Sequence, residues 1–135
     1  MDEFRRLVGK DAQVILKIED NKGLQYVAEE FRKTPGTSLM AARGDLYVEI
    51  ERPHRIAEAL RLIIRRDPEA SVGSRILLSV VNGPVPSCAD FLELAWLADI
   101  GYRKFLLCDE LCLRQALLSA AVDAFDQFRQ DHRLV

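Results

Sequence analysis

The stretch Val14-Ile15-Leu16-Lys17-Ile18-Glu19 decides the fold, together with Leu39-Met40-Ala41-Ala42-Arg43-Gly44-Asp45 further along the chain. Each is a short, mostly apolar run followed by an acid, a pattern typical of buried parallel strands. Side chains alternate between the two faces of a strand, so Lys17 and Glu19 share one face. Because a charged pair at the end of a buried strand is costly to desolvate, the pattern indicates a chemical role.

The two acids predict a metal site. Glu19 and Asp45 stand at matching ends of successive strands, so we expect them on one rim of the sheet. Magnesium takes one or two protein carboxylates and completes its coordination with water and substrate oxygens. We therefore expect Mg²⁺ or Mn²⁺ to be held between Glu19 and Asp45, as half of a metal-assisted active site.

Helical and strand patterns alternate along the chain without a long linker or a change of composition. This alternation predicts an α/β fold, with parallel strands covered by helices, in a single domain spanning residues 1–135. We expect strands over residues 13–19 and 38–42, within 72–80, and over 104–108. Helices are expected over 2–8, 21–32, 53–66, 87–99 and 110–128.

Composition narrows the classes of function. The 135 residues are 49% hydrophobic and 30% charged with a net charge of −2, which argues against a nucleic-acid or anionic-membrane surface. No apolar stretch approaches the length of a membrane span, and the first residues lack the apolar core of a signal peptide. Three cysteines (Cys88, Cys108 and Cys112) form no CxxC pair, so we expect free thiols in the cytoplasm.

At these residues the chain resembles the second half of the catalytic barrel of pyruvate kinase. The family's K-I-E-N-x-x-G segment is similar to residues 17–23, and its M-V-A-R-G-D-L-G-V-E-I segment is similar to residues 40–50. Weaker echoes follow in the same order, of A-T-Q-M-L-E-S at residues 73–79, P-T-R-A-E at 86–90 and M-L-S-G-E-T at 106–111. The resemblance implies half of a TIM (β/α)8 barrel, built from four parallel βα units.

The resemblance also implies a role for each matching residue in phosphoryl transfer between phosphoenolpyruvate and ADP. Lys17 would neutralise the phosphoryl group in flight, and Glu19 and Asp45 would hold the metal against the pyruvate enolate. Arg43 and Gly44 would bind the substrate carboxylate through nearby backbone amides, and Ser74 would act near the enolate carbon. The family also uses K⁺, but the barrel strands that carry its K⁺ site have no counterpart here.

Departures from the family pattern leave other functions open. Tyr47 replaces a glycine, Arg75 a glutamine and Cys88 an arginine, and the part of the family that binds nucleotide is absent. One alternative is a metal-dependent aldolase or lyase acting on pyruvate-type enolates, because two carboxylates on successive strands also serve that chemistry. Another is a non-catalytic barrel module that binds a partner or a 2-oxo acid.

Half a barrel poses a physical problem of its own. Four βα units would expose an apolar inner face and two strand edges, and both features favour pairing. Two copies would supply the eight strands of a closed barrel. We therefore expect a homo-oligomer, or assembly with a complementary N-terminal half-barrel.

Overall fold

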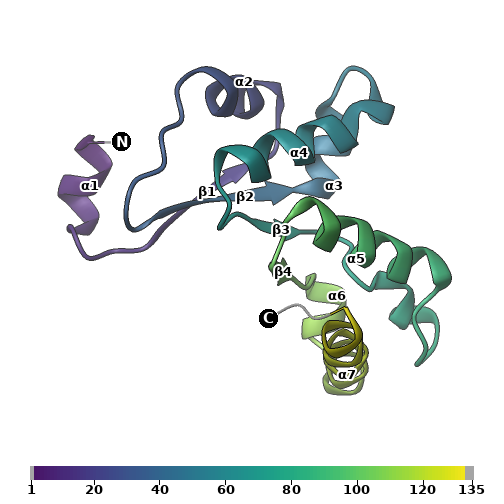
Figure 1. Ribbon diagram of the computed structural model, residues 1–135. Coiled ribbons are helices and arrows are strands. Elements are labelled where there is room, and N and C mark those ends of the chain that lie inside the picture. The colour runs from purple at the N-terminus through teal and green to yellow at the C-terminus, as the bar shows by residue number, and fades with distance from the viewer. Residues whose placement is uncertain (1, 133–135) are drawn as a thin grey trace.

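The computed structural model describes residues 2–132, in which four parallel strands alternate with helices (Figure 1). The sheet order is β1-β2-β3-β4, and every neighbouring pair is parallel. This is the topology of half a (β/α)8 barrel, as the sequence predicts. The elements are α1 (Asp2–Val8), β1 (Val14–Ile18), α2 (Asn21–Glu29), β2 (Thr37–Ala42), α3 (Arg43–Glu49), η1 (Pro53–Arg55), α4 (Ile56–Arg66), β3 (Ser71–Gly73), η2 (Leu78–Asn82), α5 (Cys88–Ile100), β4 (Lys104–Leu106), α6 (Asp109–Cys112) and α7 (Gln115–Asp131).

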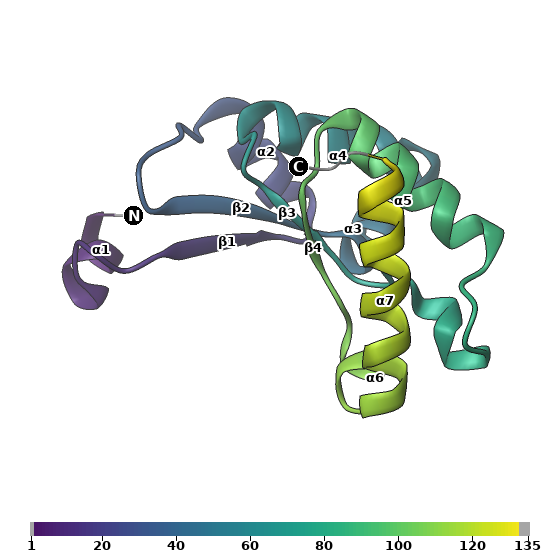
Figure 2. The ribbon, with the colours of Figure 1, turned by 60° about the horizontal axis from the view of Figure 1, so that its bottom comes forward.

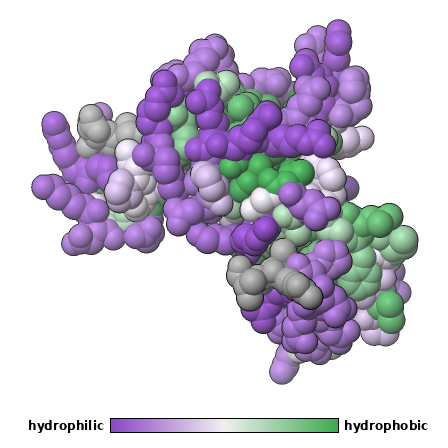
Figure 3. Space-filling view, in the orientation of Figure 1, coloured by the Kyte–Doolittle hydropathy of each residue, from purple (hydrophilic) through white to green (hydrophobic). Residues whose placement is uncertain are grey.

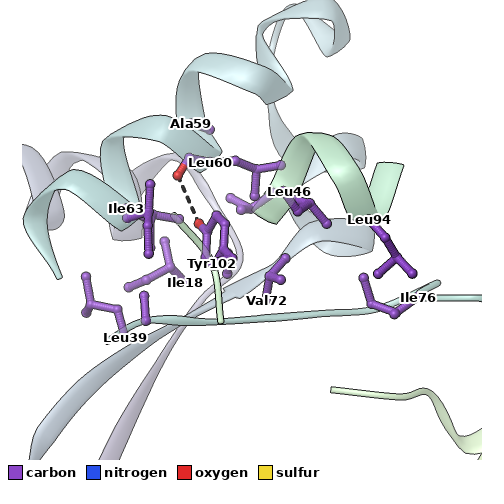
Figure 4. Packing of buried hydrophobic residues seen from close by; sticks show 14 of the residues in the cluster. Ile18, Leu39, Leu46, Ala59, Leu60, Ile63, Val72, Ile76, Leu94 and Tyr102 are labelled. Atoms are coloured by element: carbon purple, nitrogen blue, oxygen red, sulfur yellow. Dashed lines mark hydrogen bonds between the residues drawn. The ribbon is translucent and has the colours of Figure 1, made fainter. Parts of the chain in front are cut away.

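One face of the sheet is covered by helices and carries the core (Figure 2). Ile18, Leu39 and Val72 come from three successive strands and belong to the same buried cluster as Ile63 of α4 (Figure 4). The ridge of α4 that faces the sheet is apolar, with residues at the helical spacing that the sequence predicts. The phenol of Tyr102 donates a hydrogen bond of 2.9 Å to the Leu60 carbonyl, so this buried hydroxyl is satisfied.

The opposite face of the sheet, here called the open face, lies under no helix along β1. Ile15 of β1 and Leu106 of β4 point to this face and are 60% and 52% exposed. Lys17 and Lys104 share it, so the open face mixes apolar and charged residues and is less apolar than the sequence suggests. β1 and β4 also form the two free edges of the sheet, as half a barrel requires.

The first helix stands apart from the helical layer, at the amino end of the strands (Figure 1). The side chain of Arg5 joins α1 to the segments that lead into β1 and β2. Its guanidinium donates hydrogen bonds to the Ala12 and Gly36 carbonyls at 2.5 and 2.7 Å. It also donates to Thr37 Oγ1 at 2.5 Å. The apolar residues of α1 remain exposed, Leu7 by 82%.

The third strand and the last helix differ most from the expected elements, while α2 ends at Glu29 and β4 at Leu106, each a few residues earlier than expected. The third strand is short (Ser71–Gly73), because Ser74, Arg75 and Leu77 adopt positive φ values of 74°, 59° and 53° and cannot continue a strand. The expected helix over 110–128 is broken into α6 and α7, because Arg114 between them is extended (φ −127°, ψ 109°). The break accompanies burial of Leu111 in α6 and Ala121 in α7 within the same core.

An ionic cluster built on the buried Asp67 joins segments at the amino end of the sheet. The Asp67 carboxylate is fully buried and accepts hydrogen bonds from the Leu39 and Glu69 amides at 2.7 and 3.1 Å. Lys33 Nζ lies 2.8 Å from both the Asp67 and the Glu69 carboxylates. Every charged atom of Asp67 therefore has a partner, as a buried carboxylate requires.

The surface divides by polarity. Seen as in Figure 3, hydrophilic residues cover α1, α2 and the front of α4, and apolar residues reach the surface beside α5. Within residues 2–132, none of the helices has the length and apolar character needed to cross a bilayer.

Candidate functional site

The carboxyl end of β1 presents a lysine and an acid on the open face. Lys17 lies in β1 and Glu19 follows the strand, two residues on and therefore on the same face. The Lys17 ammonium forms an ion pair with the Glu19 carboxylate. Both side chains are about half exposed, at 51% and 49%. β1 is an edge strand rather than a strand buried on both faces, so the desolvation cost expected from the sequence is not present.

Asp45 reaches the same lysine from the next strand. Lys17 Nζ lies 3.2 Å from Asp45 Oδ2, and Asp45 occupies the first turn of α3, directly after β2. The parallel pairing of β1 with β2 brings the two strand ends together, which is why residues 26 positions apart share a partner. Hydrogen bonds from Lys17 to Glu19, the larger effect, and to Asp45 raise the pKa of the ammonium above 10.5, so Lys17 stays charged at neutral pH.

A hollow of about 330 Å³ opens beside these carboxylates. Its lining residues are all acidic: Glu19, Asp20, Asp45 and Glu49. Asp20 is partly engaged, because its Oδ1 accepts a hydrogen bond of 2.7 Å from the Gly23 amide and caps α2. We call this hollow the acidic hollow.

Glu49 and Asp20 were not selected by sequence reasoning. The signal for Glu49 was available, because it lies four residues after Asp45 and so one turn along the same helix. The Glu49 carbonyl also accepts a 2.9 Å hydrogen bond from Asn21 Nδ2, which fastens the end of α3 to the start of α2.

The donor set fits a hard divalent cation. Two half-exposed carboxylates, Glu19 and Asp45, converge on one point that the Lys17 ammonium now occupies. Carboxylate oxygens with room for water are the environment that magnesium accepts. Within residues 2–132, no three His, Cys, Asp or Glu side chains gather closely enough to form a metal cage by themselves, so water or substrate would have to supply the other ligands.

Gly44 and Ser74 are in close contact across β2 and β3. A Cβ atom added at Gly44 would overlap the Ser74 hydroxyl, so only glycine allows this approach. Ser74 itself has a φ of 74°, the left-handed region that non-glycine residues seldom adopt. Ser74 therefore lies beyond the end of β3 at the same rim as Asp45, rather than within a strand.

Arg43 is directed into the protein. It is only 9% exposed, its Nη2 donates a 2.7 Å hydrogen bond to the Ser74 carbonyl, and its Nη1 forms an ion pair with Glu93 of α5. Nη1 makes that contact without hydrogen-bond geometry and has no other partner within residues 2–132. These contacts brace the ends of β2 and β3 against α5, while the substrate-binding role of Arg43 stays a prediction.

Comparison with known proteins finds similarity to pyruvate kinases. The chain is 33% identical to pyruvate kinase of Thermotoga maritima over 115 residues, which are 83% of this chain and 24% of that protein. It is 35% identical to pyruvate kinase of Methanocaldococcus jannaschii over 88 residues, 63% of this chain and 19% of that protein. Pyruvate kinase 1 of Saccharomyces cerevisiae is 33% identical over 89 residues, 64% of this chain and 17% of its own length.

The chain thus spans about a fifth of the length of the curated relatives it matches. No protein-family model matches it.

Proposed function

Because this chain belongs with the pyruvate kinases, as a relative of one segment of that enzyme, we propose that its rim is a metal and enolate half-site for phosphoryl transfer. The complete reaction would pass the phosphoryl group of phosphoenolpyruvate to ADP, giving pyruvate and ATP. The observation that carries the proposal is the convergence of Glu19 and Asp45 on Lys17 at one edge of the sheet.

The two carboxylates would hold Mg²⁺ or Mn²⁺. When bound, the metal would supply Lewis-acid stabilisation to the enolate oxygen of pyruvate. The hollow beside Glu19 and Asp45 leaves room for water and for the oxygens of a 2-oxo acid. The K⁺ ion implied by the family resemblance finds no candidate ligands in our assignment.

Lys17 would act as a fixed positive charge rather than as a base. Its pKa is raised by Glu19 and Asp45, so it holds its proton at neutral pH. A charged ammonium beside the metal ligands suits the neutralisation of a phosphoryl group whose negative charge is spread over its oxygens. An aldolase or lyase would use the same carboxylates without needing this cation.

Three further residues keep roles as proposals. Gly44 lies between the two site elements, next to Asp45 and against Ser74, so it supports a substrate-binding role. Ser74 lies at the same rim and would contact the enolate. Arg43 is proposed to bind substrate only through the backbone it holds, because its guanidinium is already engaged by Glu93 and Ser74.

We propose that these four βα units pair with a further half-barrel, and that ADP would bind outside the part of the barrel described here. The exposed Ile15 and Leu106 on the open face, and the free edges of β1 and β4, support assembly either with a second copy or with a complementary half-barrel. Sedimentation equilibrium tests self-association, which Leu106→Lys should weaken. A stably folded monomer at high concentration would exclude the second copy and leave the complementary half.

Calorimetric titration with oxalate, a mimic of the pyruvate enolate, tests the half-site directly. We expect oxalate to bind only in the presence of Mg²⁺, and Glu19→Gln to abolish binding. Glu30→Gln, the same change at an exposed residue just after α2, should leave it intact. Absence of Mg²⁺-dependent binding to the unchanged chain would reject the half-site and favour a non-catalytic barrel module.

A further inference from the structure

A second hollow, of about 380 Å³, lies among the helices behind the rim. It opens between the start of α2, the connection over residues 50–55 and one side of α4 from Glu58 to Arg65. Three arginines line it, Arg52, Arg55 and Arg65, and none of its lining residues belongs to the acidic hollow. We call it the basic hollow.

The three guanidinium groups at this hollow have fewer acidic partners than positive charges. Arg55 Nε lies 2.8 Å from Glu58 Oε2, which accounts for one of the three. Arg52 and Arg65 form no ion pair or side-chain hydrogen bond with any residue in the range 2–132. Glu51 is the other acid of the lining, so the lining carries three positive charges against two negative ones in a chain whose net charge is −2.

The other two arginines of α4 are engaged by the protein. Arg61 lies over the Trp96 ring, 5.4 Å from its centroid, and the Arg66 guanidinium donates a hydrogen bond to the Ala28 carbonyl. Arg65 differs from these neighbours because it lines the basic hollow and its guanidinium has no acceptor within residues 2–132. The unengaged positive charge of this helix is therefore concentrated at one place.

The walls of the hollow have a second property, which is apolar surface. Leu24 of α2 and Ala59 and Leu62 of α4 line it beside the arginines. Its volume falls in the range of about 300–1,000 Å³ that is usual for small-molecule sites. An occupant that satisfies both kinds of wall must join a multiply charged anion to an apolar body.

We propose that the basic hollow binds an organic phosphate monoester. Arg52 and Arg65 would take the phosphoryl oxygens, because the planar guanidinium fork matches phosphate and a monoester carries close to the two charges that two free arginines call for. Leu24, Ala59 and Leu62 would pack against the organic body. A simple carboxylate would leave one of the two arginines without a counter-charge.

The basic hollow is separate from the acidic hollow but is joined to it through one hydrogen bond. Asn21 lines the basic hollow and Glu49 lines the acidic hollow. The side-chain amide of Asn21 donates a hydrogen bond to the backbone carbonyl of Glu49. Substitutions at Arg52 and Arg65 leave every proposed metal and substrate residue unchanged. The phosphate site can therefore be tested without reference to the half-site.

The test is a titration of the full chain with phenyl phosphate, at constant ionic strength and without magnesium, followed by amide NMR shifts. We expect saturable 1:1 binding with the largest shifts near Asn21, Leu24 and Ala59. The double variant Arg52→Ala/Arg65→Ala should weaken binding at least tenfold. Arg129→Ala removes one charge at an arginine that contacts Asp126 on α7, far along the chain, and should change affinity less than twofold.

Two further ligands and one further variant complete the experiment. Phenol, which lacks the phosphate, should not bind, and inorganic phosphate should bind more weakly than phenyl phosphate. Arg52→Lys/Arg65→Lys keeps both charges but loses the forks, and we expect an intermediate loss even if the alanine variant folds poorly. Lack of saturable binding, or an equal loss in Arg129→Ala, would overturn the proposal.

Discussion

The two ends of the sheet each hold a lysine between two carboxylates, yet the two clusters are built differently. At the amino end, Lys33 meets Asp67, which is fully buried and accepts two backbone hydrogen bonds. At the carboxyl end, Lys17 meets Glu19 and Asp45, all three about half exposed. No backbone amide within residues 2–132 donates to either of those two carboxylates.

The difference in burial gives the two clusters different roles, one in stability and the other in binding. A buried carboxylate whose two oxygens both have partners cannot release them without a large loss of stability. An exposed ion pair contributes little to stability and can exchange its cation for another at small cost. The open cluster, made of Lys17, Glu19 and Asp45, is therefore suited to binding a metal. The closed cluster, made of Lys33, Asp67 and Glu69, is suited to joining β2 to the segments that follow α2 and α4.

The largest expected effect is on stability at the closed cluster. Asp67→Ala should lower the free energy of unfolding by about 3–5 kcal/mol, because it leaves the buried Leu39 amide without an acceptor and removes the buried carboxylate that pairs with Lys33. Asp45→Ala, the same change at the open cluster, should alter it by less than about 1 kcal/mol. Urea denaturation of both variants measures the contrast, and equal losses would show that the two clusters are alike.

The contact of Gly44 with Ser74 should give the next largest effect. Gly44→Ala should destabilise the chain by about 1–3 kcal/mol, because its methyl group overlaps the Ser74 hydroxyl. In a Ser74→Ala background the same change should cost little, since the overlapping oxygen is gone. A double-mutant cycle by urea denaturation measures the coupling, and simple additivity would contradict the contact.

Exchange of the cation at the open cluster predicts a smaller effect. Lys17→Met removes the ammonium that now occupies the metal ligands, so Mg²⁺ should bind about two- to fivefold more tightly, as expected from the modest strength of exposed ion pairs. Calorimetry with Mg²⁺ alone measures the change. Lys22→Met is the matched control, and an equal gain there would mean that only net charge matters.

The smallest effect is the acid dependence of the closed cluster. The hydrogen bond from Lys33 lowers the pKa of Glu69 below its ordinary 4.5, so this contribution to stability is complete above pH 4.5 and is lost as pH falls through the lower, folded value. The stability difference between the unchanged chain and Glu69→Gln should therefore shrink below pH 4.5. Urea midpoints between pH 2 and 7 measure it, and a difference that persists to pH 2 would contradict the assignment.

At alkaline pH the same cluster should behave in the opposite sense. Burial alone would lower the pKa of Lys33, but its hydrogen bonds to Asp67 and Glu69 outweigh that effect and raise the pKa above 10.5. The contribution of Lys33 is therefore complete below pH 10.5 and is lost as pH rises through the folded value.

Much of the fold follows from local patterns. The strand over 38–42 and the helix that follows Ser87 were predicted closely, because apolar alternation and capping chemistry are encoded by neighbouring residues. Ser87 and Asp90 have the spacing of a capping box, in which each side chain accepts from the amide of the other residue. The Ser87 hydroxyl does accept from the Asp90 amide, but the Asp90 carboxylate accepts from Ser79 rather than from Ser87. The return half of that capping pattern depends on a residue brought close only by the fold.

The open cluster was predictable for a similar reason, and its limits are also clear. Lys17 and Glu19 share a face by strand alternation, and parallel strands place Asp45 at the same rim. The exposure of Lys17 and Glu19 was not predicted, because β1 was interpreted as a buried strand although the first of four βα units lies at an edge of the sheet. The left-handed backbone at Ser74 and the ion pair between Arg43 and Glu93 could not be predicted from a single sequence, since both depend on contacts between distant segments.

The attachment of α1 through the single side chain of Arg5 affects the order in which the parts of the chain unfold. Arg5 joins this helix to the strand ends, and the apolar side chains of α1 add little burial. A unit fastened so lightly opens at a free energy well below that of global unfolding. Amide protons of α1 should therefore exchange with solvent long before those of β2, and the chain should lose its first helix as an independent cooperative unit while the four strands stay paired.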